Sequence, residues 1–352
     1  DPSLSIQIGP GSPFFPLAGP PKGRKCALGR TALIILVIIV GGRQKSKRRQ
    51  ATPRFFPPRP VDISPSEWYP PVRPLRPPER HHINGGFSMF QLSDLLFDQL
   101  CAAVREAGAL FSRRELASQA RRKGPTDFVT AVDTAVQDQL KRHLAALAPE
   151  VQFMGEEQDN SGVDFSGPVW ILDPVDGTTN LLHDLRHSAV SLALAEKGRV
   201  LLGVVYDPYS GELFTARRGQ GAFCCGRPIH VSSAAALGEC LCSTGTNPSC
   251  RELADRTFRR MRLLYDRCHD IRRIGAASLE LSYLAAGRLD CFVEHGLKPW
   301  DYAAGMLLVR EAGGVVTTPE GGEPSLSQGS VIAAATAPVH PQLLAALREA
   351  DR

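Results

Sequence analysis

The segment WILDPVDGTTN at positions 170–180 constrains this chain more than any other part of its sequence. The apolar run at 169–172 lies between two prolines, which is typical of a short buried strand. Asp173 and Asp176 follow, and two carboxylates at the end of such a strand repel each other unless a cation neutralises them. Hard oxygen ligands of this kind suit Mg²⁺ or Ca²⁺. Capping of the next helix explains only one of the two acids, so the segment predicts a cation site.

Three small residues complete this motif. Gly177 lets the backbone approach a ligand closely, and consecutive N–H groups at Gly177, Thr178 and Thr179 can cradle a phosphate where a helix starts. We therefore expect the turn at 177–179 to bind a phosphate group beside the cation site.

Three further acids stand at expected element boundaries, and each also has a structural interpretation. Glu156 lies in FMGEEQ after a short apolar run, where adjacent glutamates usually belong to a solvated loop. Asp301 in KPWDYAAG is also explained as a favourable charge at a helix N-terminus. Asp133 in TDFVTAVD has the spacing of a capping pair with Thr130. Spacing alone leaves both the structural and the functional interpretation of these acids open.

The hydrophobic pattern after residue 89 mixes helices and strands. Apolar residues recur at helical spacing in 93–111, and a second helix is expected from about residue 130 to Pro149, with a polar connection at 121–127 between them. Further along we expect a hairpin of two strands at 189–195 and 200–206, followed by a third strand at 212–216. A helix at 279–286, a strand at 289–294 and a helix at 302–312 are expected after them. Because no βαβ unit repeats, the pattern favours a layered α/β or α+β architecture over a barrel.

Residues 1–88 differ in composition from the rest, and we expect them to form an extension before a single domain at 89–352. They contain 14 Lys and Arg against 4 Asp and Glu, and 16 of the 28 prolines, whereas the remainder carries 27 basic and 32 acidic residues. Such a basic, Pro/Arg-rich segment is expected to be largely disordered. It is a true extension, a targeting segment or a mis-assigned start before Met89. Its apolar run at 32–40 is shorter than the roughly 20 residues of a membrane-spanning helix.

The nine cysteines include no CxxC pair, so we expect neither a zinc cluster nor a disulfide framework. Reduced thiols favour a cytosol-like compartment, and the expected location is cytoplasmic. The mildly acidic residues 89–352 give no reason to expect nucleic-acid binding, and nothing in them predicts membrane attachment.

Four segments resemble the inositol monophosphatase family of metal-dependent sugar phosphatases: TDFVTAVD, GEE, WILDPVDGTTN and KPWDYAAG, in that order. The resemblance covers about residues 89–352 and none of residues 1–88. It implies a layered αβαβα sandwich of the inositol monophosphatase and fructose-1,6-bisphosphatase type. It also implies dependence on Mg²⁺, sensitivity to lithium and a homodimer.

The resemblance implies roles for individual residues at the matching positions. The metal ligands would be Glu156, Asp173, Asp176, Asp301 and the backbone carbonyl of Val175. Glu156 and Thr178 would position the attacking water, with Asp133 orienting Thr178. The turn formed by Gly177, Thr178 and Thr179 would contact the phosphate, and Glu294 would bind hydroxyls of a sugar or inositol ring.

Two departures from the family pattern bear on the substrate. Ala276 stands where many relatives have a small hydroxyl residue, and we expect the missing hydroxyl to loosen one substrate contact. Arg122, followed by Lys123, stands where a lysine is common. Neither position belongs to the implied metal ligands.

These assignments predict a phosphoric monoester hydrolase that acts on a small phosphorylated polyol. Inositol 1-phosphate is favoured because a carboxylate at Glu294 can accept hydrogen bonds from adjacent hydroxyls and would repel an additional phosphate. Fructose bisphosphate, histidinol phosphate and 3′-phosphoadenosine 5′-phosphate are alternative substrates of the same class. A regulatory protein associated with RNA or a transcription complex is the alternative from another class.

Overall fold

The computed structural model describes Phe90 and residues 92–352. The extension expected at 1–88, with its apolar run at 32–40, lies outside these described residues. Within them, no helix is both long enough and apolar enough to cross a membrane.

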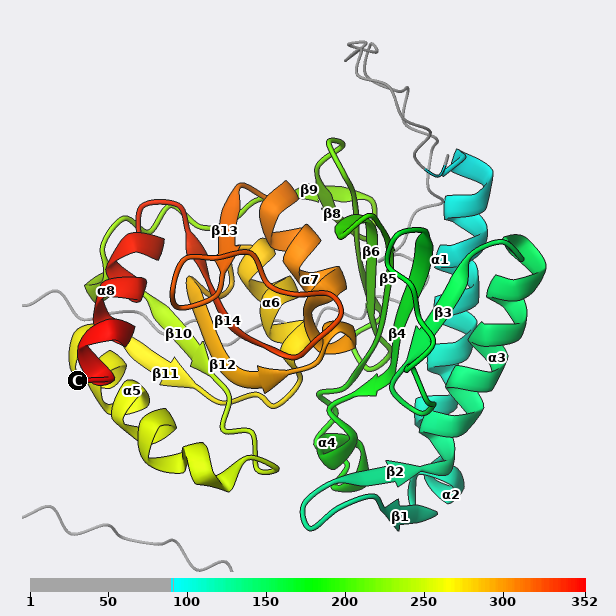
Figure 1. Cartoon of the computed structure of the whole chain (residues 1–352), viewed down its shortest axis with the longest axis horizontal. Coiled ribbons are helices and arrows are strands. Elements are labelled where there is room, and N and C mark those ends of the chain that lie inside the picture. Colours follow the sequence, from blue (N-terminus) through cyan, green and yellow to red (C-terminus); the bar gives the residue numbers. More distant parts are fainter. Residues whose placement is uncertain (1–89, 91) are drawn as a thin grey trace, which may run out of the picture. The chain divides into compact units, whose positions relative to one another are not determined.

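Two long helices form one outer layer of the described domain (Figure 1). α1 spans Asp94–Gly108 and α3 spans Ala131–Leu147, which confirms the two helices predicted from apolar spacing. A side-chain oxygen caps each N-terminus, from Ser93 in α1 and Thr130 in α3. The apolar faces of both helices pack against the first sheet. The residues that they bury completely include Leu100, Val104, Val136 and Leu140.

The first sheet has seven strands in the order β3-β4-β5-β6-β7-β8-β9. They are β3 (Gln152–Gly155), β4 (Pro168–Asp176), β5 (Ala189–Glu196), β6 (Arg199–Asp207), β7 (Glu212–Arg217), β8 (Ala222–Cys224) and β9 (Arg227–Ile229). β3 pairs in parallel with β4, and the other neighbours are antiparallel, including the predicted hairpin of β5 and β6. The pairing of β4 with β5 shifts register between Asp173 and Asp176, so the motif acids stand at an irregular strand end.

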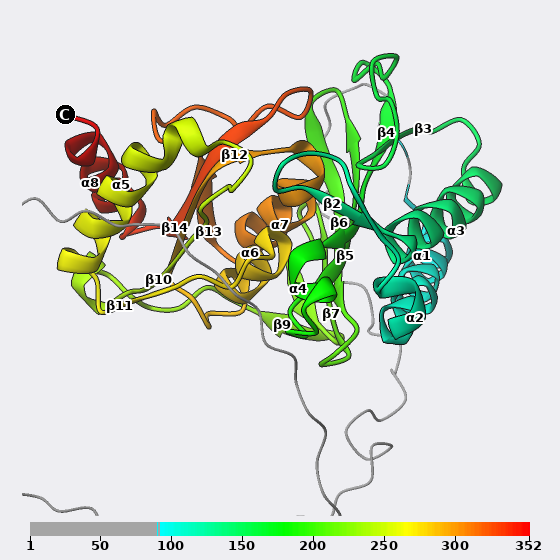
Figure 2. The ribbon, with the colours of Figure 1, turned by 90° about the horizontal axis from the view of Figure 1, so that it is seen from below.

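Two helices lie between this sheet and a second one (Figures 1 and 2). They are α6 (Ala277–Ala285) and α7 (Pro299–Glu311), both close to the predicted positions. Both are buried over most of their surface, as expected for helices that are apolar on nearly every side. A close approach packs α7 against β6, because a Cβ on Gly203 would lie 2.6 Å from the Ala304 carbonyl oxygen.

The second sheet has five strands in the order β11-β10-β12-β14-β13. They are β10 (Leu241–Thr244), β11 (Asp270–Arg272), β12 (Cys291–Leu297), β13 (Gly314–Thr317) and β14 (Ser330–Thr336). α5 (Ala254–Arg267) and α8 (His340–Ala350) cover its outer face (Figure 1). The succession of helices, sheet, helices, sheet and helices is the αβαβα sandwich that the resemblance implies.

A hairpin occupies the segment that the sequence pattern predicted to be only a polar connection. β1 (Ala120–Arg122) pairs with β2 (Phe128–Thr130), and Lys123 follows β1 in the turn. All of β1 is exposed, so it lacks the apolar alternation that marks a half-buried strand. The other short elements are α2 (Arg114–Ala117), α4 (Thr178–Leu182) and the 3-10 turns Ala109–Ser112, Leu237–Glu239 and Arg251–Leu253.

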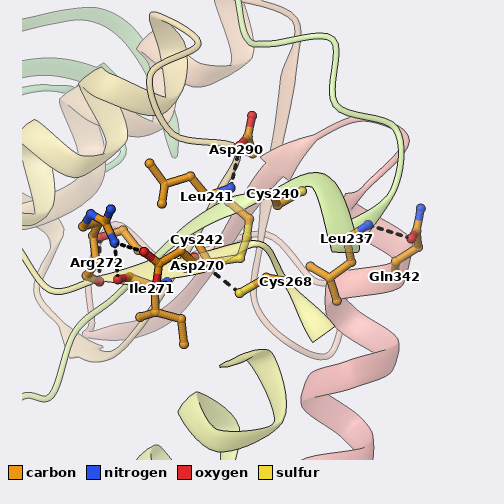
Figure 3. The surroundings of a disulfide bond; sticks show 12 residues. Leu237, Cys240, Leu241, Cys242, Cys268, Asp270, Ile271, Arg272, Asp290 and Gln342 are labelled. Carbon is orange, nitrogen blue, oxygen red and sulfur yellow. Dashed lines mark hydrogen bonds and ion pairs between the residues drawn. A yellow bond between two sulfur atoms is a disulfide. The ribbon is translucent and has the colours of Figure 1, made fainter. Parts of the chain in front are cut away.

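A disulfide joins Cys242 of β10 to Cys291 of β12 (Figure 3). The two residues are opposite each other in the parallel ladder, with Cα atoms 4.8 Å apart, a separation that a disulfide spans. The expectation that all thiols are reduced is therefore wrong for this pair. Its members are 49 positions apart in the sequence, and only strand pairing brings them together.

Candidate active site

Asp176 ends β4 and caps the N-terminus of α6. Its Oδ1 accepts a hydrogen bond from the Ala277 N–H at 3.1 Å, and its Oδ2 accepts one from the Ser278 N–H at 2.7 Å. N–H groups in the first turn of a helix have no partner within the helix, and the helix dipole favours a negative charge there. Burial raises the pKa of Asp176 to about 6, and these hydrogen bonds oppose the rise.

Asp173 and Asp301 approach the same region from different elements. Each accepts a backbone N–H, at 2.9 Å for Asp173 in β4 and at 2.7 Å for Asp301 in the first turn of α7. Burial raises the pKa of both carboxyls, and the negative charges of Glu156 and Asp176 raise both further. Because the charges of Glu156 and Asp176 act on both Asp173 and Asp301, the four acids share one region of excess negative charge, which we call the acid cluster.

Glu156 follows β3, and its backbone N–H donates to the Leu172 carbonyl at 3.2 Å. Burial raises the pKa of its carboxyl to about 7, although the positive charge of Lys123 opposes the rise. Lys123 Nζ lies 3.1 Å from Glu156 Oε1 and also binds Glu157. Arg122, at the position where the family commonly has lysine, lies instead over an aromatic ring. The β1–β2 hairpin thus brings an ammonium group to the acid cluster, a contact that the sequence pattern did not predict.

Asp133 is a helix cap and a partner of Thr178 at once. Its Oδ2 accepts the Thr130 N–H at 2.9 Å, which completes a capping box at the start of α3. Its Oδ1 lies 3.1 Å from Thr178 Oγ1, which also lies 3.0 Å from the Val175 carbonyl oxygen. Burial raises the pKa of Asp133, and the hydrogen bonds from Thr130 and Thr178 lower it. The structure therefore contains both the capping contact with Thr130 and the contact with Thr178, between which sequence spacing alone could not decide.

The turn at 177–179 leads from β4 into α4 and can only begin with glycine. Gly177 has φ 88°, and a Cβ there would lie 2.9 Å from the His187 carbonyl oxygen. The Ser188 hydroxyl donates to the Gly177 carbonyl at 2.9 Å, which ties the turn to the start of β5. Ala276, predicted to lie at a substrate contact, is 1% exposed and stands next to Gly177, so a substrate contact there stays a prediction.

Glu294 reaches this region from β12 of the second sheet. It lies directly against Gly245, because a Cβ there would be 1.7 Å from the Glu294 carboxyl carbon, so any other residue would displace the carboxyl group. Burial raises the pKa of Glu294 to about 8, the negative charge of Glu280 adds to the rise, and Arg273 lowers it. The charge of Asp176 also raises this pKa, so Glu294 lies within electrostatic range of the acid cluster.

Glu280 is a fully buried acid in α6 that the sequence pattern gives no reason to single out. Its Oε1 accepts from the Ser243 hydroxyl and from the Ile274 N–H at 3.3 Å, while its Oε2 has no hydrogen-bond partner among the residues that the structure describes. Burial raises the pKa of Glu280 to about 7. Its helix reads as an apolar run, so the sequence predicts the helix but not the surroundings of the acid.

The predicted metal ligands are not collected into a finished coordination shell. Across Phe90 and residues 92–352, no three His, Cys, Asp or Glu side chains are arranged so that they could hold a metal ion. Instead, carboxylate oxygens of Asp173, Asp176 and Asp301 accept backbone N–H groups, and Glu156 binds Lys123. These acids share one electrostatic region, and their role as metal ligands stays a prediction.

Comparison with known proteins decides the family. A model described as "Inositol monophosphatase family" matches residues 94–352. The chain belongs to this family. It is 41% identical to the Nus factor SuhB of Escherichia coli (strain K12) over 234 residues, which are 66% of this chain and 88% of the relative. It is 40% identical to the inositol-1-monophosphatase of Rhizobium meliloti (strain 1021) over 241 residues, 67% of this chain and 90% of the relative.

Solved structures of the inositol monophosphatase family share the fold. The extragenic suppressor protein suhB from Bartonella henselae is 36% identical, with a TM-score of 0.69, and the match covers 73% of this chain and 99% of that one. The family is one of metal-dependent phosphatases, so the prediction of a phosphatase-type hydrolase is confirmed at this level. The names of the relatives divide between a Nus factor and an inositol-1-monophosphatase and do not fix the substrate.

Proposed function

We propose that the protein hydrolyses the phosphate monoester of a small polyhydroxylated ring with Mg²⁺ as cofactor, and that inositol 1-phosphate is its substrate. The observation that supports this most is the acid cluster beside the turn at 177–179, in which the charges of Glu156 and Asp176 raise the pKa of Asp173 and Asp301. An anionic substrate would be repelled by these acids unless cations stood between them.

The donor chemistry of the acid cluster fits magnesium. Glu156, Asp173, Asp176, Asp301 and the carbonyl of Val175 all offer oxygen, the ligand that Mg²⁺ prefers. A divalent cation would also remove the mutual repulsion that raises the pKa of Asp173 and Asp301. When bound, it supplies an activated water and neutralises charge on the phosphate. Binding would have to draw the side chains closer together than they lie in the described structure.

The residues of the chain position the attacking water and the phosphate. Phosphate monoesters hydrolyse extremely slowly without a catalyst, so orientation of the water contributes directly to the rate. Thr178 would orient the water, because its contacts with Asp133 and with the Val175 carbonyl restrict the rotation of its hydroxyl. Glu156 would accept a hydrogen bond from the same water through its carboxylate oxygens.

The preference for a polyol rests on Glu294. A carboxyl group can hydrogen-bond two adjacent ring hydroxyls at once, and Gly245 leaves room for it where any other residue would displace it. Its burial and its raised pKa show that water solvates it poorly, so a substrate hydroxyl would be a favourable partner. Fructose bisphosphate, histidinol phosphate and 3′-phosphoadenosine 5′-phosphate remain alternative substrates.

The test is phosphate release by the full chain from these four esters, with and without Mg²⁺. We expect magnesium-dependent release with a preference for inositol 1-phosphate. In the variant Asp176→Asn, an oxygen remains to cap α6, so the fold should persist while turnover is lost. Retained turnover in this folded variant would contradict the ligand assignment, and preference for another ester would contradict only the substrate.

A second candidate function follows from the name of one relative, the Nus factor SuhB. A role in a transcription complex would require a protein–protein or RNA contact and no turnover. Asp176→Asn separates the two functions, because a scaffold should tolerate it. Complementation of a strain that lacks its SuhB by both the wild type and Asp176→Asn would favour the transcription role, and complementation by the wild type alone would favour catalysis.

A further inference from the structure

His295 follows Glu294 on β12 and is 3% exposed. Successive side chains of a strand project from opposite faces of the sheet. His295 therefore points away from Glu294, toward the helices that cover the outer face. A buried polar ring costs free energy unless it has hydrogen-bond partners, so its partners show what holds this part of β12 in place.

The imidazole of His295 accepts a hydrogen bond from a buried guanidinium. Arg260 in α5 has a side chain that is 2% exposed, and its Nη1 lies 2.9 Å from His295 Nε2. Since a guanidinium only donates, Nε2 accepts and the ring is neutral. Burial and the positive charge of Arg260 lower the pKa of His295 to about 4, in agreement with this assignment.

Asp351, directly after α8, compensates the charge of Arg260. Arg260 Nε donates to its Oδ1 at 2.9 Å, and Arg260 Nη2 binds its Oδ2, so the pair is bidentate. Arg256, whose side chain is 40% exposed, also binds Asp351, with Nη2 2.6 Å from Oδ2, and its positive charge also lowers the pKa of His295. Burial alone would raise the pKa of Asp351, and the two guanidinium groups hold it well below its usual range.

The backbone of β12 is also held at this point. The ladder between β12 and β14 shifts register between Glu294 and Leu297, so His295 lies in the irregular stretch immediately after the proposed substrate acid. The His295 carbonyl accepts from Asn247 Nδ2 at 2.9 Å. Both the side chain and the carbonyl of His295 are thus fixed, and Glu294 is attached to the fixed residue by one peptide bond.

We propose that Asp351, Arg260 and His295 form a positioning network that holds Glu294 in place for contact with substrate hydroxyls. The proposal rests on the function proposed above. None of the three residues touches substrate. They act through β12: the carboxylate fixes the guanidinium, the guanidinium fixes the imidazole, and the imidazole fixes the strand at its irregular point.

The test compares two phosphate esters in the full chain, inositol 1-phosphate and p-nitrophenyl phosphate, which has no ring hydroxyls for Glu294. His295→Leu removes the acceptor for Arg260. We expect its KM for inositol 1-phosphate to rise about tenfold, the loss typical of one charge-assisted hydrogen bond, with kcat and the kinetics on p-nitrophenyl phosphate unchanged. His295→Gln retains an acceptor and should restore most of the affinity. Arg262→Ala is the matched control, because this exposed arginine of α5 pairs with Asp266, and it should leave both substrates unaffected.

An unchanged KM in His295→Leu would overturn the network. Equal losses on both substrates, with no rescue by His295→Gln, would also overturn it, because they indicate a general structural role. If His295→Leu does not fold, Asp351→Asn takes its place and must show the same selective rise in KM.

Failure of the proposed function gives a different pattern. Glu294→Gln must itself change the preference between the two esters, and if it does not, the role given to Glu294 is wrong. If the wild type releases no phosphate at all, the network is judged by amide hydrogen exchange at residues 293–297. His295→Leu must then accelerate that exchange and Arg262→Ala must not.

Discussion

Thr178 Oγ1 lies 3.1 Å from Asp133 Oδ1 and 3.0 Å from the carbonyl oxygen of Val175. A hydroxyl has one proton to donate, so these two acceptors compete for it. The first acceptor comes from α3, 45 positions away in the sequence, and the second from the end of β4. Two layers of the sandwich therefore determine the orientation of one hydroxyl group.

Removal of that hydroxyl should impair turnover without unfolding the protein. Thr178→Val has the same shape but cannot orient a water, and we expect kcat on inositol 1-phosphate to fall about a hundredfold or more. Thr178→Ser keeps the hydroxyl and should retain most of the activity. Steady-state kinetics with circular dichroism as the control for folding measures this. Equal activity of the valine and serine variants would contradict the role of Thr178.

A methyl group on Gly245 should displace the carboxyl of Glu294. The Cβ would lie 1.7 Å from the carboxyl carbon, so Gly245→Ala must move one of the two groups. We expect KM for inositol 1-phosphate to rise about tenfold, comparable to the loss of a hydrogen bond to a charged group. Gly238→Ala is the control, because its Cβ would meet only the Arg267 carbonyl at 3.6 Å. A normal KM in Gly245→Ala would mean that Glu294 does not bind substrate.

Stability without metal should fall as the pH rises. Burial holds the pKa of Glu280 at about 7 and that of Glu294 at about 8 in the folded protein, against the ordinary value of 4.5. At a pH between the ordinary pKa and the raised pKa, the folded protein keeps a proton on each group that the unfolded chain has released. The free energy of unfolding therefore decreases as the pH rises, by about 1 kcal/mol or more for each group.

Thermal melting in a chelator at about pH 5 and about pH 8 measures this slope. Glu280→Gln cannot ionise and should reduce the difference in melting temperature between the two conditions. Glu106→Gln, at an exposed position of α1, should leave the difference unchanged. The expectation is contradicted if the wild type is more stable at the higher pH.

The disulfide between Cys242 and Cys291 should be present in the purified protein and should contribute to its stability. Closing a loop of 49 residues contributes about 4 kcal/mol on chain-entropy grounds, so a strong reductant should lower the melting temperature. Peptide mapping without reductant should find the linked peptides. Cys268→Ser, which removes a free thiol of the same region (Figure 3), should retain the link. Alkylation of all nine cysteines in unreduced, unfolded protein would show that no link exists.

The parts of the fold that could be predicted are those in which local pattern and burial agree. α1 and α3 carry an apolar stripe at helical spacing after a capping residue, and the β5–β6 hairpin consists of two apolar runs around a short turn. α5 shows the opposite case. Its buried positions are Thr257, Arg260 and Leu264, so an ion pair holds part of its inner face beside an apolar contact. The sequence pattern gave no reason to expect a buried arginine there.

The candidate site could be predicted in its acids but not in their partners. Asp173, Asp176 and Thr178 lie in one motif, so local sequence sufficed to single them out. Lys123 and Ser278 contact these acids from a hairpin and from a helix start that are distant in the sequence. The same holds for Cys242 and Cys291. Contacts of this kind depend on strand order and on the packing of the layers. No local periodicity of the sequence specifies either of them.

The hydrogen bonds from α6 to Asp176 have a consequence for the growing chain. Asp176 and Ala277 are 101 positions apart, so a ribosome completes the whole DPVDGTT motif long before the helix that stabilises its last carboxylate exists. Until α6 arrives, that carboxylate is an uncompensated charge at the end of an apolar strand. The first sheet can thus gain its final arrangement only after the second half of the domain has been synthesised. We therefore expect fragments that end before α6 to be degraded by proteases and not to refold partially.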